Sequence, residues 1–242
     1  MKKLLLSICI LVLANSSYGQ NEAVPDSANL SFNVDLGVAS RNIWRGLDYG
    51  SSPSIWGDVY GSFKNFSIGA MGTNSLNGSK SGYGNWMELY ASYTFKNLTF
   101  VVDDYFFFNS EDSLNNYFDY TPQNTQHLVE ARIEYENDYL DAMAGYVVYS
   151  NNADNTNGVY LEATYKPNKK LSFTAGYLTA SQWLSFYDKG GITTLGINGH
   201  RNLNVFKRKL PLTASLILNP NYQNASPAVG NNPIYFVLKT DF

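Results

Sequence analysis

Apolar and polar residues alternate along most of this chain, and this period of two restricts the fold more than any other feature. Segment 30–40 has an apolar face with Phe32, Val34, Leu36 and Val38, and a second face with Asn33, Asp35, Gly37 and Ala39. Alternate side chains point to opposite faces of a β-strand, whereas a helix repeats about every 3.6 residues. The pattern returns throughout the chain without sustained helical spacing, so the chain is predicted to be all-β.

The connectors between the alternating segments indicate how the strands are arranged. The predicted strands are 30–40, 54–63, 66–73, 86–95, 98–107, 127–135, 139–149, 158–165, 171–180, 191–198, 210–218 and 233–242. Tight connectors at 64–65, 96–97, 136–138 and 166–170 alternate with long ones rich in Asn, Ser, Gly and Asp, although 199–209 is unusually long. Short turns at one end and long loops at the other are typical of outer-membrane barrels. We therefore predict an antiparallel up-and-down transmembrane β-barrel of about twelve strands.

The N-terminus has the features of an export signal. Lys2 and Lys3 precede an apolar run and a small-residue stretch that ends at Gly19, which predicts a cleaved signal peptide at 1–19. A flexible leader at 20–28 and the barrel at 29–242 would follow. The single cysteine, Cys9, lies in the signal, so no disulfide is expected in the mature chain. We predict localisation in the outer membrane of a Gram-negative bacterium.

Aromatic side chains beside the short turns favour a membrane barrel over a soluble one. They form a predicted girdle of Phe63, Phe66, Phe95, Tyr135, Tyr165 and Phe242. Such girdles lie at the membrane interfaces of outer-membrane barrels. A soluble β-sandwich or lipocalin-like barrel would also alternate, but its second face would be solvated, whereas here that face mixes carboxylates with Tyr, Gly and Ser. The terminal strand, which ends on Phe242, resembles the signal read by the outer-membrane assembly machinery.

The polar face carries an excess of acids. The ionisable residues predicted to face the lumen are Asp35, Asp58, Glu88, Asp103, Glu130, Arg132, Glu134, Asp141, Glu162, Lys239 and Asp241, nine acids to two bases. If these side chains line water, the lumen should attract cations. The alternative is that they pair with one another, for example Glu130 or Glu134 with Arg132 and Asp241 with Lys239, and plug a narrow barrel.

One acid falls on the apolar face. Continuing the alternation of segment 98–107 would place Asp104 in lipid, at a cost of about 2 kcal/mol or more. We therefore expect a β-bulge at 102–104 that turns Asp103 and Asp104 away from lipid.

The first connector and its flanks resemble the TorF-type family of outer-membrane porins. The stretch Val38-Ala39-Ser40-Arg41-Asn42-Ile43-Trp44-Arg45-Gly46-Leu47 contains the Ser-x-x-x-x-Arg-Gly motif that follows the first strand in that family. A second strand then begins shortly after Pro53, and the strand that starts at Trp86 is acidic in the family but keeps only Glu88 here. The resemblance covers most of the mature chain in the order of its elements. It implies a barrel and a pore, and the family has no firmly assigned activity.

Arg41, Trp44 and Arg45 are a candidate site where the first strand enters the first long loop. They could contact lipopolysaccharide phosphate or fold inward as a constriction, because arginine pairs well with phosphate and carboxylate. The preferred interpretation is an interfacial anchor, with Trp44 at the headgroup level and the arginines reaching into water.

Enzyme chemistry has little support in the sequence. Outer-membrane lipid hydrolases place a serine two residues from a histidine on one strand, and neither His127 nor His200 has one. A triad assembled across strands from His127 with Ser110 or Ser113 is the alternative, and no catalytic residue, metal site or cofactor is predicted. A nucleic-acid partner is not expected, since the net charge is −3 without blocks of like charge.

Three functions follow from these observations. The first is a porin or narrow diffusion channel for small solutes, cation-preferring if open. The second is a plugged structural or adhesive barrel that acts through its external loops. The third, and least supported, is a lipid-modifying enzyme. The expected partners are outer-membrane lipid and lipopolysaccharide, the assembly machinery and small solutes.

Overall fold

Long β-strands account for most of the described chain. The computed structural model describes residues 30–77, 84–108, 116–121, 125–150, 158–180, 186–205 and 208–242, so the predicted signal peptide at 1–19 and leader at 20–28 lie outside the described residues. The long strands within these ranges are β1 (Leu30–Ala39), β4 (Ser54–Phe63), β5 (Phe66–Ser75), β6 (Trp86–Phe95), β7 (Leu98–Phe107), β8 (His127–Glu136), β9 (Leu140–Ser150), β10 (Val159–Asn168), β11 (Leu171–Leu178), β12 (Gly191–Val205), β13 (Arg208–Leu218) and β14 (Ile234–Asp241). Two short strands, β2 (Ile43–Trp44) and β3 (Leu47–Asp48), and a 3-10 helix at Tyr222–Asn224 lie in the connecting segments. In these ranges, no helix is long and apolar enough to cross a membrane.

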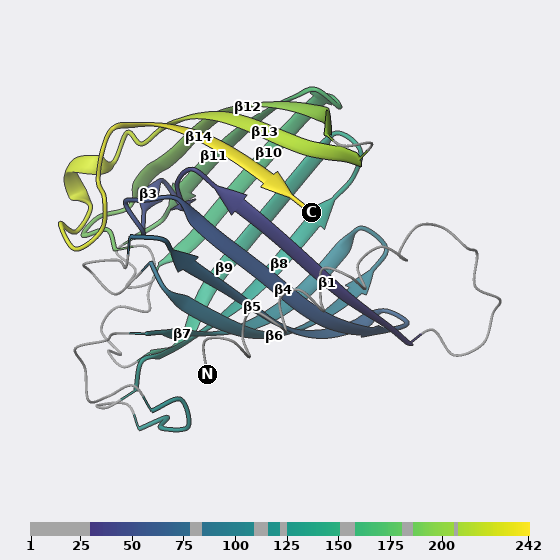
Figure 1. Ribbon diagram of the computed structural model, residues 1–242. Coiled ribbons are helices and arrows are strands. Elements are labelled where there is room, and N and C mark those ends of the chain that lie inside the picture. The colour runs from purple at the N-terminus through teal and green to yellow at the C-terminus, as the bar shows by residue number, and fades with distance from the viewer. Residues whose placement is uncertain are drawn as a thin grey trace.

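The twelve long strands form one closed antiparallel barrel (Figure 1). Each strand pairs with its neighbours in sequence, and β1 pairs with β14 to close the ring. The prediction of an up-and-down antiparallel barrel is therefore confirmed. The long loops gather at one end, on the left in Figure 1, and the short turns lie at the other. We refer to these ends as the long-loop end and the short-turn end.

Strands β12 and β13 extend further than predicted around 199–209. That segment was expected to be a long connector, but β12 continues to Val205 and β13 begins at Arg208. The two strands stay paired along this extension, from Gly199 opposite Ala214 to Val205 opposite Arg208. The prediction of a long connector was wrong, because the pairing of β12 with β13 continues as far as Val205 and Arg208.

The predicted bulge at 102–104 is also wrong. Strand β7 pairs with β6 in unbroken register there, with Asp103 opposite Tyr90 and Asp104 opposite Leu89. Asp103 therefore faces the lumen and Asp104 stays on the outer wall. The outer site is tolerated because Asp104 accepts hydrogen bonds from Tyr120 and pairs with His127. A register shift does occur in this region, but it lies between β8 and β9 at Val129 and Glu130.

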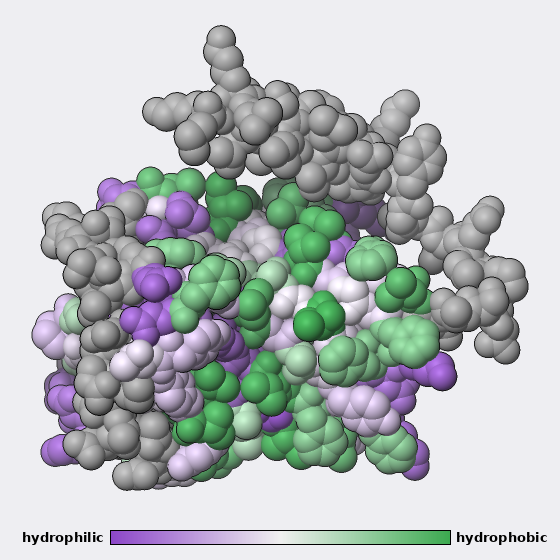
Figure 2. Space-filling view, turned by 90° about the horizontal axis from the view of Figure 1, so that it is seen from below, coloured by the Kyte–Doolittle hydropathy of each residue, from purple (hydrophilic) through white to green (hydrophobic). Residues whose placement is uncertain are grey.

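The outer wall of the barrel is apolar. Its exposed side chains include Phe32, Ile68, Phe100, Val148 and Phe236, each of which is at least half exposed. Figure 2 shows hydrophobic residues grouped over the middle of one face of the wall, with hydrophilic residues toward its margins. The side chains of the predicted aromatic girdle are all exposed, from 36% for Tyr135 to 64% for Phe242. This surface is the reverse of a soluble fold, in which the large apolar side chains are buried.

Candidate functional site in the barrel lumen

The first long loop folds into the barrel and forms a hairpin there. We refer to residues 40–53, which contain β2 and β3, as the plug hairpin. Trp44 pairs with Leu47 across a two-residue turn made by Arg45 and Gly46, which have φ values of 51° and 84°. Two-residue hairpins favour turns with positive φ at both central positions, which a glycine accommodates without strain. A Cβ atom at Gly46 would lie 2.0 Å from the carbonyl oxygen of Thr193, so the tip also packs tightly against the wall.

Arg45, at the tip of the plug hairpin, is buried inside the lumen. Its Nη2 atom donates to both carboxylate oxygens of Glu130, at 2.8 and 2.7 Å. Its guanidinium carbon lies 4.3 Å from the centre of the Trp44 ring and 4.4 Å from that of Tyr160. The Arg45 and Glu130 side chains are 1% and 0% exposed. The interfacial-anchor interpretation is therefore wrong for Arg45 and Trp44, because the buried Glu130 carboxylate and the Tyr160 ring hold the tip inside the barrel.

The plug hairpin is also tied to two other segments at the long-loop end. Asp48 and Gly230 exchange two backbone hydrogen bonds, at 3.0 and 2.9 Å. The Tyr187 hydroxyl donates to the carbonyl of Arg45, and the Asn219 amide donates to that of Gly46. Arg41 lies at the edge of the plug with a side chain that is 43% exposed and pairs with Asp48 at 2.5 Å.

Apolar side chains fill the space around the plug hairpin. Those that are fully or almost fully buried are Leu47, Tyr49, Tyr160, Leu178, Tyr187, Ala225 and Val229, with Trp44, Met143 and Phe186 packed against them. A second cluster on the wall consists of Tyr105, Phe107, Leu128 and Val147, which Trp44 also contacts. Among the described residues, the plug hairpin and these side chains therefore fill the long-loop half of the lumen at close packing.

Three predicted lumen carboxylates lie against or just below the plug. Glu130, Asp103 and Glu88 are 0%, 0% and 6% exposed. Asp103 binds Arg132, with Nη2 to Oδ1 at 3.0 Å and Nε to Oδ2 at 2.9 Å. Glu130 and Asp103 are thus buried carboxylates that each pair with an arginine.

The remaining predicted lumen acids lie in a wetter environment toward the short-turn end. Asp35 is exposed, while Asp58, Glu134, Asp141 and Glu162 are half-buried. Asp58 accepts hydrogen bonds from Tyr90, Glu162 accepts one from Tyr160, and Asp141 pairs with Lys166 at 2.5 Å. Glu134 lies 3.4 Å from Arg132, and Lys239 lies 3.5 Å from Asp241. The predicted pairs of Arg132 with Glu134 and of Lys239 with Asp241 are thus present, but Glu130 takes Arg45 instead.

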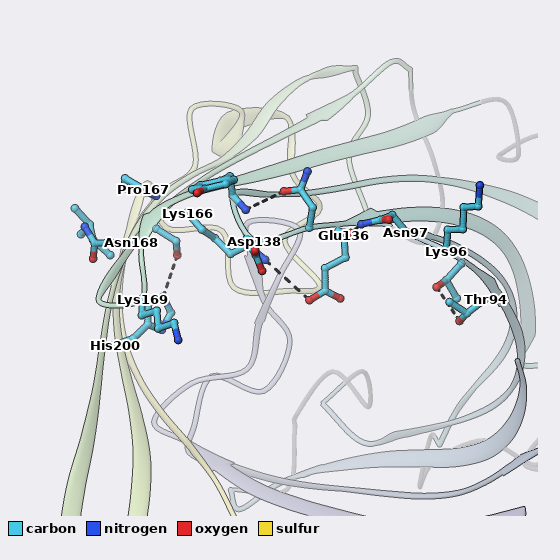
Figure 3. A pocket seen from close by; sticks show the side chains of 15 residues that line it. Thr94, Lys96, Asn97, Glu136, Asp138, Lys166, Pro167, Asn168, Lys169 and His200 are labelled. Carbon is cyan, nitrogen blue, oxygen red and sulfur yellow. Dashed lines mark hydrogen bonds and ion pairs between the residues drawn. The ribbon is translucent and has the colours of Figure 1, made fainter. Parts of the chain in front are cut away.

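A polar cavity opens at the short-turn end (Figure 3). Its volume is about 800 Å³, and Lys96, Glu136, Asp138, Lys166 and His200 are among the residues that line it. The side chains come from three short turns, from the strand ends beside them and from β12, and Figure 3 shows them along the rim of the barrel. The two halves of the lumen therefore differ, because one is filled by a loop and the other is hollow.

His127 lies on the outer wall, where neighbouring side chains and a backbone carbonyl hold its ring in place. Its Nδ1 atom is 2.8 Å from Asp104 and its Nε2 atom is 2.5 Å from the carbonyl oxygen of Tyr117. The Tyr120 ring stacks on the imidazole at 3.9 Å, and burial and the neighbouring Asp104 carboxylate raise the pKa of the Tyr120 phenol. Both ring nitrogens of His127 are thus occupied, while Ser110 and Ser113 lie outside the described residues.

Metal coordination has no candidate in the part of the chain that the structure describes. No group of three or more His, Cys, Asp or Glu side chains there is arranged to hold a metal ion.

Sequence reasoning did not predict the pairing of Arg45 with Glu130, which are 85 residues apart in the chain. The available signal was the sequence Trp44-Arg45-Gly46-Leu47, in which a glycine at a turn position lies between apolar residues. The pattern fits a tight hairpin with an arginine at its tip. The pattern does not specify whether the hairpin folds into the lumen or lies outside the barrel.

Comparisons with known proteins do not assign a family. No protein-family model matches the chain, and no curated protein matches its sequence. One similar solved structure is Wzi, an outer membrane protein involved in group 1 capsule assembly in Escherichia coli that is described as a carbohydrate-binding β-barrel. The identity is 10% and the TM-score 0.37, over 87% of this chain and 56% of that one, so this chain spans little more than half of its length. Membership of the TorF-type family stays a prediction.

Proposed function

We propose that this chain is an outer-membrane channel for small cations, closed in the present conformation by the plug hairpin. The observation that carries the proposal is that a loop segment, rather than the wall itself, fills the long-loop half of the lumen. A plug made by a loop can move without breaking the strand pairing of the barrel. A barrel filled by the side chains of its own wall would instead have to repack those side chains to open.

The outer wall supports the membrane location. Large apolar side chains such as Phe32, Ile68 and Phe236 are between 60% and 78% exposed, and they recur around the barrel. Soluble monomers rarely expose continuous apolar patches above a few hundred Å². The closed barrel also pairs most backbone groups of its wall between neighbouring strands, as a membrane requires. Lipid and lipopolysaccharide would then be the surroundings of this wall.

The charge of the wetter half supports the preference for cations. Asp35, Asp58, Glu134, Asp141 and Glu162 are at least partly exposed there. Lys166 and Arg132 offset part of this charge through their pairs with Asp141 and Glu134. Acids still outnumber bases along this path, and carboxylates in a narrow lumen favour cation entry.

A second candidate function is a permanently plugged barrel that acts through its loops. The two backbone hydrogen bonds between Asp48 and Gly230 favour it, because they join the plug hairpin to another long loop. This candidate predicts no current from any variant of the chain.

The C-terminal strand supports a partnership with the outer-membrane assembly machinery. Only Gly37 to Ala39 of β1 pair with β14, whereas β1 pairs with β4 along its full length. The Phe242 amide adds a hydrogen bond to Leu36 at this short seam, 2.7 Å long. Deleting Phe242 should lower outer-membrane levels several-fold on immunoblots of membrane fractions, while Phe242→Tyr should keep them. Equal levels for the deletion and the wild type would argue against this role.

Single-channel recording in planar bilayers tests the channel directly. The wild type should be closed most of the time. Glu130→Gln removes the charge that holds Arg45, so this variant should conduct more often and prefer potassium over chloride. Glu134→Gln is the matched control, since Glu134 lies on the same face of β8 and pairs with Arg132, which is part of the wall, and not with Arg45. Absence of current from both variants would favour the plugged barrel.

A further inference from the structure

The wall offers Arg45 a preformed pocket. Glu130 on β8 supplies the carboxylate and Tyr160 on β10 supplies an aromatic face, and both are 0% exposed. Gly145, on the strand between them, leaves the space that the carboxylate occupies, because a Cβ atom there would lie 2.6 Å from Glu130 Oε1. The Tyr160 hydroxyl donates to Glu162 at 2.7 Å, which fixes the ring. The pocket is therefore built by the barrel and would remain if the plug hairpin moved away.

The chemistry of this pocket matches a guanidinium group. A planar cation stacks on aromatic faces and donates hydrogen bonds in its own plane to a carboxylate, whereas a primary ammonium acts as a compact, strongly hydrated charge. Burial strengthens both contacts, since water does not compete for the carboxylate. A buried carboxylate without a cation would be costly, so the pocket requires an occupant.

Arg45 fills the pocket incompletely. Only its Nη2 atom reaches the Glu130 carboxylate, while Nε and Nη1 are buried without a hydrogen-bond partner among the described residues. Guanidinium binds a carboxylate best through two parallel hydrogen bonds from two nitrogens. Arg45, which is fixed to the backbone of the plug hairpin, does not have that geometry. A free guanidinium group has no such tether and could form both bonds.

We propose that Glu130 and Tyr160 form a binding site for solutes that carry a guanidinium group, and that Arg45 occupies it as an internal surrogate in the closed state. This inference rests on the proposed channel function, in which such a solute competes with Arg45 and releases the plug hairpin. The acids of the wetter half, including Asp58 and Glu134, would concentrate the cation near the site. The solute class is therefore an organic cation of the arginine type.

Calorimetry on the Arg45→Ala variant, refolded in detergent, tests the site without requiring conductance. Guanidinium chloride is the probe, and it should bind in the millimolar range. Tetramethylammonium, which has the same charge but donates no hydrogen bond, should bind about tenfold more weakly. Adding Glu130→Gln should remove guanidinium binding, whereas adding Glu134→Gln should leave it. Equal binding of the two cations, or binding that survives Glu130→Gln, would overturn the proposal.

A second variant keeps the test decisive if Arg45→Ala does not refold. Arg45→Lys retains a positive charge for Glu130. Guanidinium should displace this lysine ammonium more readily than tetramethylammonium does. In bilayers, guanidinium should raise the open probability of Arg45→Lys more than tetramethylammonium does. Binding without current in any variant would reject the channel and keep the site. Current without preference for guanidinium would reject the site and keep the channel.

Discussion

The two halves of the lumen are built by the same strands and yet have opposite interiors. Toward the long-loop end, Arg45 and Glu130 are buried and their surroundings are packed with aromatic and aliphatic side chains. Toward the short-turn end, the acids are partly exposed and a cavity of about 800 Å³ opens to the outside. The difference arises from a segment that is not part of the wall. Alternation along the strands specifies a polar inner face, and the position of the first loop determines which part of that face is exposed to water.

Removing one cation from each half should give the largest contrast. Arg45→Ala leaves the Glu130 carboxylate buried without its partner, so it should lower the free energy of unfolding by about 3–5 kcal/mol. Lys166→Ala removes a pair with Asp141 whose members are 26% and 43% exposed, and it should cost about 0.2–1 kcal/mol. Urea titration of the protein refolded in vesicles measures both. Similar costs for the two variants would mean that the halves do not differ in burial.

Adding a methyl group at a glycine of each half sharpens the contrast in packing. Gly46→Ala should cost about 1–3 kcal/mol, because Gly46 has a φ of 84° and a Cβ atom would meet the Thr193 carbonyl. Gly199→Ala on β12 has only an ordinary contact, 3.8 Å from Ala214, so it should change stability by less than about 0.5 kcal/mol. Thermal unfolding by circular dichroism measures both. A Gly46→Ala variant as stable as Gly199→Ala would show that the tip is loosely held.

Ion selectivity should respond more to acids of the wetter half than to acids under the plug. Glu134→Gln and Glu162→Gln should each lower the permeability ratio of potassium to chloride roughly twofold, since each contributes on the order of 0.5 kcal/mol after screening. Glu88→Gln should change selectivity less, because Glu88 is only 6% exposed. Reversal potentials under a salt gradient give the ratio. A larger effect of Glu88→Gln would reverse the order of the two halves.

The wall was predictable from sequence because side-chain parity is local. Residues such as Asp103, Glu130 and Phe242 took the predicted faces once the strands were delimited. The inward fold of Trp44 and Arg45 was one of the alternatives that the sequence left open, but the partner of Arg45 was not predictable, since it lies 85 positions away and no local pattern encodes that contact. The prediction of a β-bulge at Asp104 was wrong for a similar reason. Its partners, His127 and Tyr120, come from the next strand and its preceding loop, so a bulge was not needed.

A reversible tether on the plug hairpin measures most directly whether this segment closes the lumen. Asp48 and Gly230 are close enough to be bridged by a disulfide. A Cβ atom at Gly230 would lie 2.8 Å from that of Asp48, so the two backbones would have to separate by about 1 Å to reach the spacing of about 3.5–4.5 Å in disulfides. The sole natural cysteine, Cys9, lies in the predicted signal peptide. In a protein that combines Asp48→Cys and Gly230→Cys with Glu130→Gln, the oxidised form should stay closed in planar bilayers, and a reductant should start cation current in the same channel. Equal current before and after reduction would contradict the account.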